Sequence, residues 1–226
     1  MVAPIRIAQF LPYVMPHAPG APDIVAEKYI RMAAIEFCER TRCWRHLISV
    51  DLTDQTTEAM IAPYYAAIHE IEYASFTSEF SQKRALTPTQ FSDVSKEYRP
   101  SLETGQPEYV TQTNPNHVTV LPLAAGTLEL SVFLKPRMGQ QFGPGELGDP
   151  IQDDFNVVPD FLLTQWGEAV ACGALSKLLM VPQQRWTDPK MGGFYLTKFE
   201  RACDKHFSQS IRGQQRKAKR TRFSFM

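Results

Sequence analysis

Helical sequence patterns lie at both ends of this chain. In much of the stretch of about a hundred residues between them, apolar and polar residues alternate, as is typical of β-strands. The first helical region ends in the segment Cys38–Arg45, and the second ends in Gln184–Pro189. Neither region is a complete helical domain, so the two ends must meet in space while the middle projects from them. This layout is more typical of an assembly protein than of an enzyme.

The fold class expected from this layout is α+β. Residues 1–47 and 156–212 are predicted to form one discontinuous helical bundle, and residues 48–155 a β-rich insert resembling a sandwich or barrel. Residues 213–226 are predicted to form an extended basic arm. The chain has 226 residues, of which 43% are hydrophobic, so it can bury a packed core.

Three helices follow from apolar spacing. Asp23 is a plausible N-cap for a helix whose apolar face continues through Phe37 to Trp44. A second helix, rich in small residues, begins at Pro159, and Asp188–Pro189 opens the last one. The side chains predicted to share one helical core are Phe37, Trp44, Trp166, Leu178, Phe194 and Phe199.

The middle of the chain predicts strands at 48–52, 67–76, 109–113, 117–121 and 127–135. Residues 124–126 are predicted to form the hairpin turn before the last strand. A capping box at Thr87–Gln90 predicts a short helix to about Lys96. Residues 1–22 contain five prolines and are predicted to be extended. Residues 136–158 form a long loop with Phe142 and Phe155 as apparent anchors.

Charge is distributed unevenly along the chain. The chain has 24 basic and 24 acidic residues. Seven of the basic residues follow Asp204, and no acidic residue lies among them. The rest of the chain therefore has 17 basic and 24 acidic residues. The body is therefore acidic and the end basic. The candidate contact residues of this end are Arg212, Arg216, Lys217, Lys219, Arg220, Arg222, Phe223 and Phe225.

Three interpretations of this basic end stay open. It could bind phosphates with salt-dependent affinity that is independent of base sequence. It could be a solvated, disordered tail. It could also be an arm that docks on an acidic partner surface and ends in an aromatic plug formed by Phe223 and Phe225.

Sequence motifs for catalysis are absent. The chain has no Walker A pattern, GxGxxG, GxSxG or HExxH, so no catalytic residue, cofactor or metal is predicted. Zinc at Cys38, Cys43, Cys203 and His206, or magnesium at Asp153–Asp154, is a weaker alternative to core cysteines and a solvated loop. The prolines near the start argue against a signal peptide, and no segment is long enough to span a membrane.

The two helical ends carry short segments that resemble head–tail adaptor proteins of tailed bacteriophages, a family of connectors similar to tail tubular protein A. The segments that carry this resemblance are Pro19–Pro22, Ala34–Arg45, Gly173–Leu179, Trp186–Pro189 and Phe199. The resemblance covers both helical ends and the order of elements, whereas the middle matches in character more than in motif.

This resemblance implies a structural virion protein that is not an enzyme. It implies a homo-oligomeric ring of twelve subunits, which docks beneath the portal protein, extends the DNA channel and attaches the next tail component, a nozzle, stopper or tail tube protein. DNA would pass through without sequence-specific contact, and an acidic body suits such a conduit. The protein would be made in the bacterial cytoplasm and reside at the head–tail interface of the virion, without contact to a membrane. The alternative is a phage accessory protein that binds nucleic acid through its basic tail.

Overall fold

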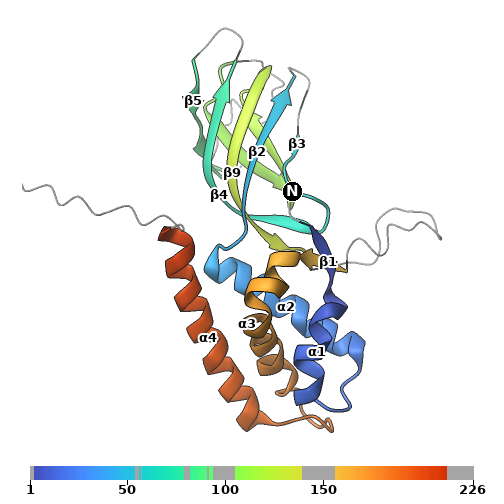
Figure 1. Ribbon diagram of the computed structural model, residues 1–226. Helices are drawn as coiled ribbons and strands as arrows, with labels where there is room; N and C mark the ends of the chain where they lie inside the picture. Colours follow the sequence, from blue (N-terminus) through green and yellow to red (C-terminus); the bar gives the residue numbers. More distant parts are fainter. Residues whose placement is uncertain are drawn as a thin grey trace, which may run out of the picture.

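The computed structural model describes residues 3–53, 56, 58–78, 82–90, 92–93, 105–138 and 156–212, with side chains described as far as Phe207. Within this part the protein is mixed α+β, as the sequence predicts. The helices gather at one end of the molecule and the sheets at the other (Figure 1). Phe142, Phe155 and Asp153–Asp154 lie outside the described residues.

The first residues are not an extended lead-in, and that prediction is wrong. After the short strand β1 (Pro4–Arg6), the chain turns through η1 (Ile7–Phe10), α1 (Leu11–Val14) and η2 (Met15–His17). Pro12 and Pro16 lie in the first turns of α1 and η2, where proline costs no hydrogen bond. Ile7, Phe10 and Val14 are fully buried at helical spacing. The prolines therefore start short helices here and do not prevent them.

The helix α2 (Asp23–Thr41) follows closely the predicted pattern. Its apolar residues Ala26, Ile30, Ala33 and Phe37 are fully buried. Asp23 is the first helical residue and not the N-cap: Pro22 occupies the cap position, and no side chain caps the helix there. The helix ends at Thr41, and the left-handed φ of 51° at the next residue, Arg42, turns the chain toward the sheets.

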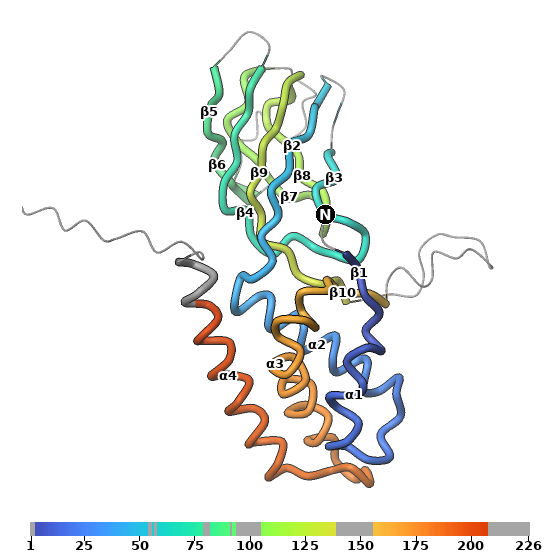
Figure 2. Tube along the Cα trace, viewed as in Figure 1, coloured from blue at the N-terminus to red at the C-terminus, as the bar shows by residue number. Residues whose placement is uncertain are grey.

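The two remaining long helices are α3 (Asp160–Leu178) and α4 (Pro189–Arg212), both at predicted positions. They pack on α2 and on each other. Figure 2 shows these C-terminal segments, orange to red, beside the blue N-terminal segment. The core of this helical part thus contains residues from both ends of the chain, among them Phe37, Leu178 and Phe199.

The remaining strands form two larger sheets and a small ribbon. One sheet has the order β2-β9-β4-β5 and the other β3-β8-β7-β6, while β1 pairs with β10 between sheets and helices. The bounds are β2 Arg45–Leu52, β3 Ala59–Met60, β4 Ala66–Thr77, β5 Arg84–Ala85, β6 Thr87–Pro88, β7 Tyr109–Asn114, β8 His117–Leu121, β9 Gly126–Pro136 and β10 Val157–Pro159. Figure 1 shows the two larger sheets stacked above the helices.

Alternation along β9 explains how the sheets share a core. Leu128, Leu130, Val132 and Leu134 are buried on one face, as predicted from their period of two. They join one cluster with residues of the second sheet, including Val110. The apolar face of each sheet is therefore covered by the other sheet.

Two predictions for the middle of the chain are wrong. Thr87–Gln90 does not open a helix, because the backbone N–H of Thr87 bonds to the carbonyl of Glu108 and that of Thr89 to Val110, which makes β6 a parallel neighbour of β7. Residues 124–126 do not form a hairpin, since β8 and β9 belong to different sheets. Gly126 is needed for another reason: a Cβ there would collide with the carbonyl oxygen of Thr77.

A chain of aromatic rings joins the helical core to the β core. The ring centre of Phe37 lies 5.6 Å from that of Trp166, and the ring centre of Trp166 lies 5.5 Å from that of Phe161. The ring centres of Phe161 and Trp44 are 6.1 Å apart. Trp44 then stacks on Tyr65. Trp44 was predicted in the helical core, but it belongs to the β core because the chain has already left α2 at Arg42. Phe161 packs against both cores and is the link between them.

Candidate functional site

The helix α4 holds the described residues that lead into the predicted contact segment, so the candidate site is built from it. Asp188 sets its start: the carboxylate accepts the N–H of Met191 at 3.0 Å, and the backbone carbonyl accepts that of Gly192 at 2.9 Å. Pro189 occupies the first helical position, as predicted. The cap fixes the direction in which the helix then runs.

One face of α4 is pressed into the helical core. Tyr195, Phe199 and Cys203 are 7%, 1% and 1% exposed. Gly173 of α3 lets Phe199 approach, because a Cβ at Gly173 would be 2.7 Å from the ring and 3.0 Å from Ala33 of α2. Three helices therefore meet at one glycine, and α4 is closely packed along this face.

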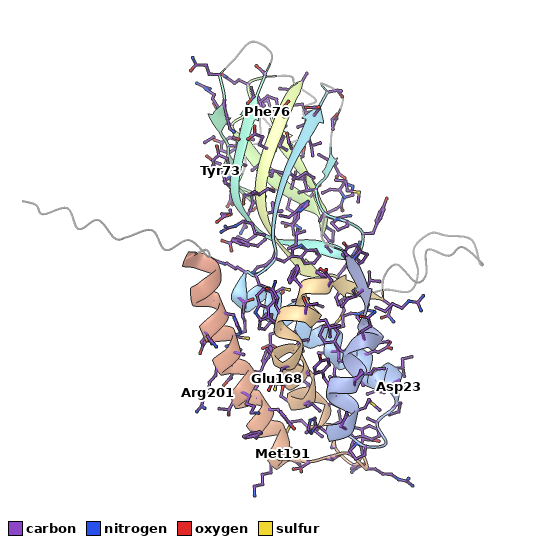
Figure 3. The ribbon with its side chains drawn as sticks, in the orientation of Figure 1. Asp23, Tyr73, Phe76, Glu168, Met191 and Arg201 are labelled. Carbon is purple, nitrogen blue, oxygen red and sulfur yellow. The ribbon has the colours of Figure 1, made fainter. Side chains whose placement is uncertain are left out.

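Another face of α4 presents three cations to solvent. Lys198, Arg201 and Lys205 are exposed and follow each other at spacings of three and four residues, which places them in one stripe. None of them has an ion-pair partner among the described residues. Figure 3 shows Arg201 on the outer side of α4, away from the other helices. We call these three residues the basic stripe.

The stripe begins at an apolar end. Phe194 is 51% exposed, and the ammonium group of Lys198 lies 4.9 Å from its ring centre. Met191, one turn earlier, is also exposed and marks the tip of the helical part in Figure 3. Phe194 was predicted in the helical core; it is on the surface because the neighbouring Tyr195 takes the buried position.

The predicted contact residues themselves lie beyond the described side chains. Arg212 is the last residue of α4, but its side chain is not described. The members that lie outside the described residues altogether are Arg216, Lys217, Lys219, Arg220, Arg222, Phe223 and Phe225. The basic stripe lies on α4 and precedes these residues in the sequence. Lys205 is one of the seven basic residues that follow Asp204, whereas Lys198 and Arg201 were not predicted, although the spacing of these three residues was their signal.

The cysteines occupy the core of the helical part. The thiol of Cys43 donates to Cys38 with a sulfur–sulfur distance of 3.9 Å. Burial raises the pKa of the Cys38 thiol well above its ordinary range, and raises the pKa of Cys203 to about 12. Both thiols are therefore held protonated, which suits core packing better than metal ligation or nucleophilic attack.

His206 does not complete a zinc site with these thiols. Its ring lies 6.0 Å from that of Phe37 and 5.8 Å from that of Trp166, so it packs among aromatics. Across the described part of the chain, no group of three or more His, Cys, Asp or Glu residues could hold a metal ion.

A polar cluster around Asn156 fixes the segment that leads into β10. The amide oxygen of Asn156 accepts a hydrogen bond from Arg31, and its amide nitrogen donates to Glu27 at 3.1 Å. The backbone carbonyl of Asn156 also accepts from Ile7. Asn156 therefore ties the residue before β10 to both the N-terminal segment and α2, and this role could not be read from the sequence.

Comparison with known proteins gives no assignment. No protein-family model matches the chain, and no curated protein sequence matches it. No helix in the described part of the chain is long and apolar enough to cross a membrane.

Proposed function

We propose that this chain is a head–tail adaptor of a tailed bacteriophage. On this proposal its copies form a ring of twelve beneath the portal protein, extend the DNA channel and carry the next tail component. The helical part would be the ring-forming body, residues 48–155 the insert and residues 213–226 the arm. The protein would have no catalytic activity of its own and would reside at the head–tail interface of the virion.

The layout of the core supports this proposal. Residues near the start and the end of the chain share one core, as Phe37, Leu178 and Phe199 illustrate. The β part extends from one end of this core, away from the tip at Met191 (Figure 3). A compact body with a projecting β part suits an assembly protein, because one region can contact copies of itself while the other faces a different partner.

The observation that carries the proposal is the basic stripe. Lys198, Arg201 and Lys205 are exposed, lack ion-pair partners among the described residues, and lie on a helix that leads into the basic C-terminal segment. Exposed like charges in one row repel each other and contribute little to folding, so a partner of opposite charge is the simplest reason for them. An acidic docking surface on the portal fits this requirement.

A binding experiment with the portal protein of the same phage tests this function. The full-length chain should co-sediment with purified portal rings at low salt, and electron microscopy of the complex should show twelve copies in a ring. The triple variant Lys198→Glu, Arg201→Glu, Lys205→Glu should lose most of this binding, as should deletion of residues 213–226. Arg84→Glu, an exposed charge change on β5, should bind like the wild type. A wild-type chain that never associates with the portal would exclude the proposal.

The same stripe also supports the second candidate function, nucleic-acid binding. Together with the basic residues of the C-terminal segment, its cations would release counterions from a DNA duplex, so affinity would fall steeply with salt. The test is fluorescence anisotropy with a labelled duplex of random sequence at increasing salt concentration. Affinity that is lost in both the triple variant and the tail deletion would favour this function. No measurable binding at low salt would remove it.

A further inference from the structure

The strand β2 is a long, regular edge strand. Among the described residues it pairs only with β9, and the eight residue pairs from Arg45–Phe133 to Leu52–Gly126 show no register shift. The N–H of Leu134 donates to the carbonyl of Trp44, so even-numbered residues of this segment direct their peptide groups toward β9. Arg45, Leu47, Ser49 and Asp51 direct theirs outward, where no backbone partner exists among the described residues.

Most of the devices that usually protect such an edge are missing from β2, and its charged residues Arg45 and Asp51 lie near its two ends. The strand contains no proline, lysine or bulge, whereas β4 in the same sheet is interrupted by two register shifts. Leu47 is 73% exposed in the middle of the strand. An eight-residue edge with free peptide groups and an exposed leucine is suited to adding another strand.

The core face of β2 is also incompletely covered. Ile48 and Val50 are only half-buried, although their neighbours on β9, Leu130 and Leu128, are 3% and 0% exposed. The β core is therefore open along this side. A further strand beside β2 would extend the sheet and cover the remaining apolar surface of Ile48 and Val50.

We propose that β2 binds β2 of a second copy of this chain in antiparallel orientation, so that two β2-β9-β4-β5 sheets become one continuous sheet. In the register centred on Ile48, Arg45 of each copy lies opposite Asp51 of the other, and Leu47 lies opposite Ser49. All four outward-directed residues are then paired, which gives about eight backbone hydrogen bonds.

Charge complementarity selects this occupant and this register. A shift of two residues in either direction leaves one outward residue of each copy unpaired and separates the opposite charges. In the centred register two Arg–Asp pairs form across the two-fold axis. The guanidinium of Arg45 forms an ion pair with Glu72 through one nitrogen, and one carboxylate oxygen of Asp51 accepts a hydrogen bond from the Thr127 hydroxyl. Both side chains therefore have further atoms that can bond to a second copy.

The centred register also closes the core side. Ile48 of one copy lies opposite Ile48 of the other, and His46 lies opposite Val50. The contact is isologous, so it joins two copies and then stops. It is distinct from a ring interface and does not depend on the proposed function.

The experiment is the mass of the full-length chain in solution, measured by analytical ultracentrifugation or native mass spectrometry over a range of micromolar concentrations. A concentration-dependent dimer is expected. Ser49→Pro removes an outward N–H while leaving the β2–β9 bonds intact, and it should abolish the dimer. Ser49→Ala is the matched control and should dimerise like the wild type. Circular dichroism establishes that both variants are folded.

A charge swap tests the register. Asp51→Arg places Arg45 opposite a second arginine, and Arg45→Asp places two aspartates together, so each single variant should weaken dimerisation about tenfold. The double variant Arg45→Asp, Asp51→Arg restores opposite charges and should recover it.

Three results would overturn the inference: a wild-type chain that stays monomeric at all concentrations, a dimer that survives Ser49→Pro, or a charge swap without recovery. If the wild type and Ser49→Pro form the same rings, the proposed β2–β2 contact is overturned, while the adaptor proposal still stands.

Discussion

Phe199 occupies the space that a side chain at Gly173 would need. The distance from a Cβ at Gly173 to the Cε2 atom of Phe199 would be 2.7 Å, and the distance to the Cβ atom of Ala33 would be 3.0 Å. Since both neighbours are fully buried or nearly so, neither can move away without disturbing the packing of three helices.

Gly173→Ala is therefore expected to destabilise the protein by about 1–3 kcal/mol, because overpacking outweighs the better helix propensity of alanine. Urea unfolding followed by circular dichroism measures this change. Gly193→Ala is the control: apart from the adjacent residues and backbone of α4 itself, no atom lies within 4 Å of the position that a Cβ would take there, so the same substitution should leave the stability unchanged or raise it by up to about 1 kcal/mol. Equal effects at the two glycines would contradict the packing argument.

Phe161 is expected to couple the unfolding of the helical and β parts. It contacts Trp166 on one side and Trp44 on the other. Phe161→Ala should cost about 2–4 kcal/mol and separate the helix signal in circular dichroism from the β-sheet band of the infrared amide I spectrum during thermal unfolding. Tyr64→Ala, at a 62% exposed position, should keep the two signals coincident. Coincident transitions in Phe161→Ala would show that the two cores are coupled elsewhere.

Asn156 is expected to stabilise the junction through its side-chain amide. Asn156→Ala removes the amide that bonds to both Arg31 and Glu27. These two half-buried side chains then lose their shared partner, so the free energy of unfolding should fall by about 1–3 kcal/mol. Asn156→Asp keeps an acceptor for Arg31 but places a negative charge beside Glu27, so it should lie between wild type and alanine at neutral pH. Chemical denaturation of the three proteins provides the comparison. An alanine variant as stable as the wild type would show that the backbone contact to Ile7 suffices.

The buried thiols predict a loss of stability at alkaline pH. Burial raises the pKa of Cys203 from an ordinary value of about 9.0 to about 12. Between these values the unfolded chain releases this proton and the folded chain keeps it, so stability decreases as pH rises, by at most about 1.4 kcal/mol per pH unit for this group.

Unfolding free energies between about pH 8 and 10.5 measure that slope. Cys203→Ala should make it shallower without removing it, because burial also raises the pKa of Cys38 and Cys172. A slope that is the same in wild type and Cys203→Ala would contradict the assignment to this thiol.

Periodic segments could be predicted well from sequence. The helix containing Ala26, Ile30 and Ala33 and the strand containing Leu128 and Leu130 repeat apolar residues at one period, and both lie where expected. Local signals were misleading where distant partners override them. The cap-like Thr87 joins a sheet because its N–H finds Glu108, and the prolines near the start introduce short helices because Ile7 and Phe10 pack on the helical core.

Only part of the candidate site could be predicted from the spacing of residues in the sequence. The basic stripe could have been found from the positions of Lys198, Arg201 and Lys205, whereas the surface position of Phe194 depends on which side of α4 meets Gly173. Trp44 was assigned to the wrong core for a similar reason, since the left-handed turn at Arg42 cannot be deduced from apolar spacing. The free edge of β2 needed the strand order itself.

The chain enters and leaves the β part through neighbouring strands. Arg45, where β2 begins, is paired with Phe133 near the end of β9. The backbone carbonyl of Trp44 accepts a hydrogen bond from the N–H of Leu134. A segment whose two ends are adjacent can be replaced by another unit with adjacent ends while the surrounding framework keeps its geometry. Evolution or an engineer could therefore exchange residues 45–133 as a cassette, and change what this end of the molecule contacts without redesigning the helices.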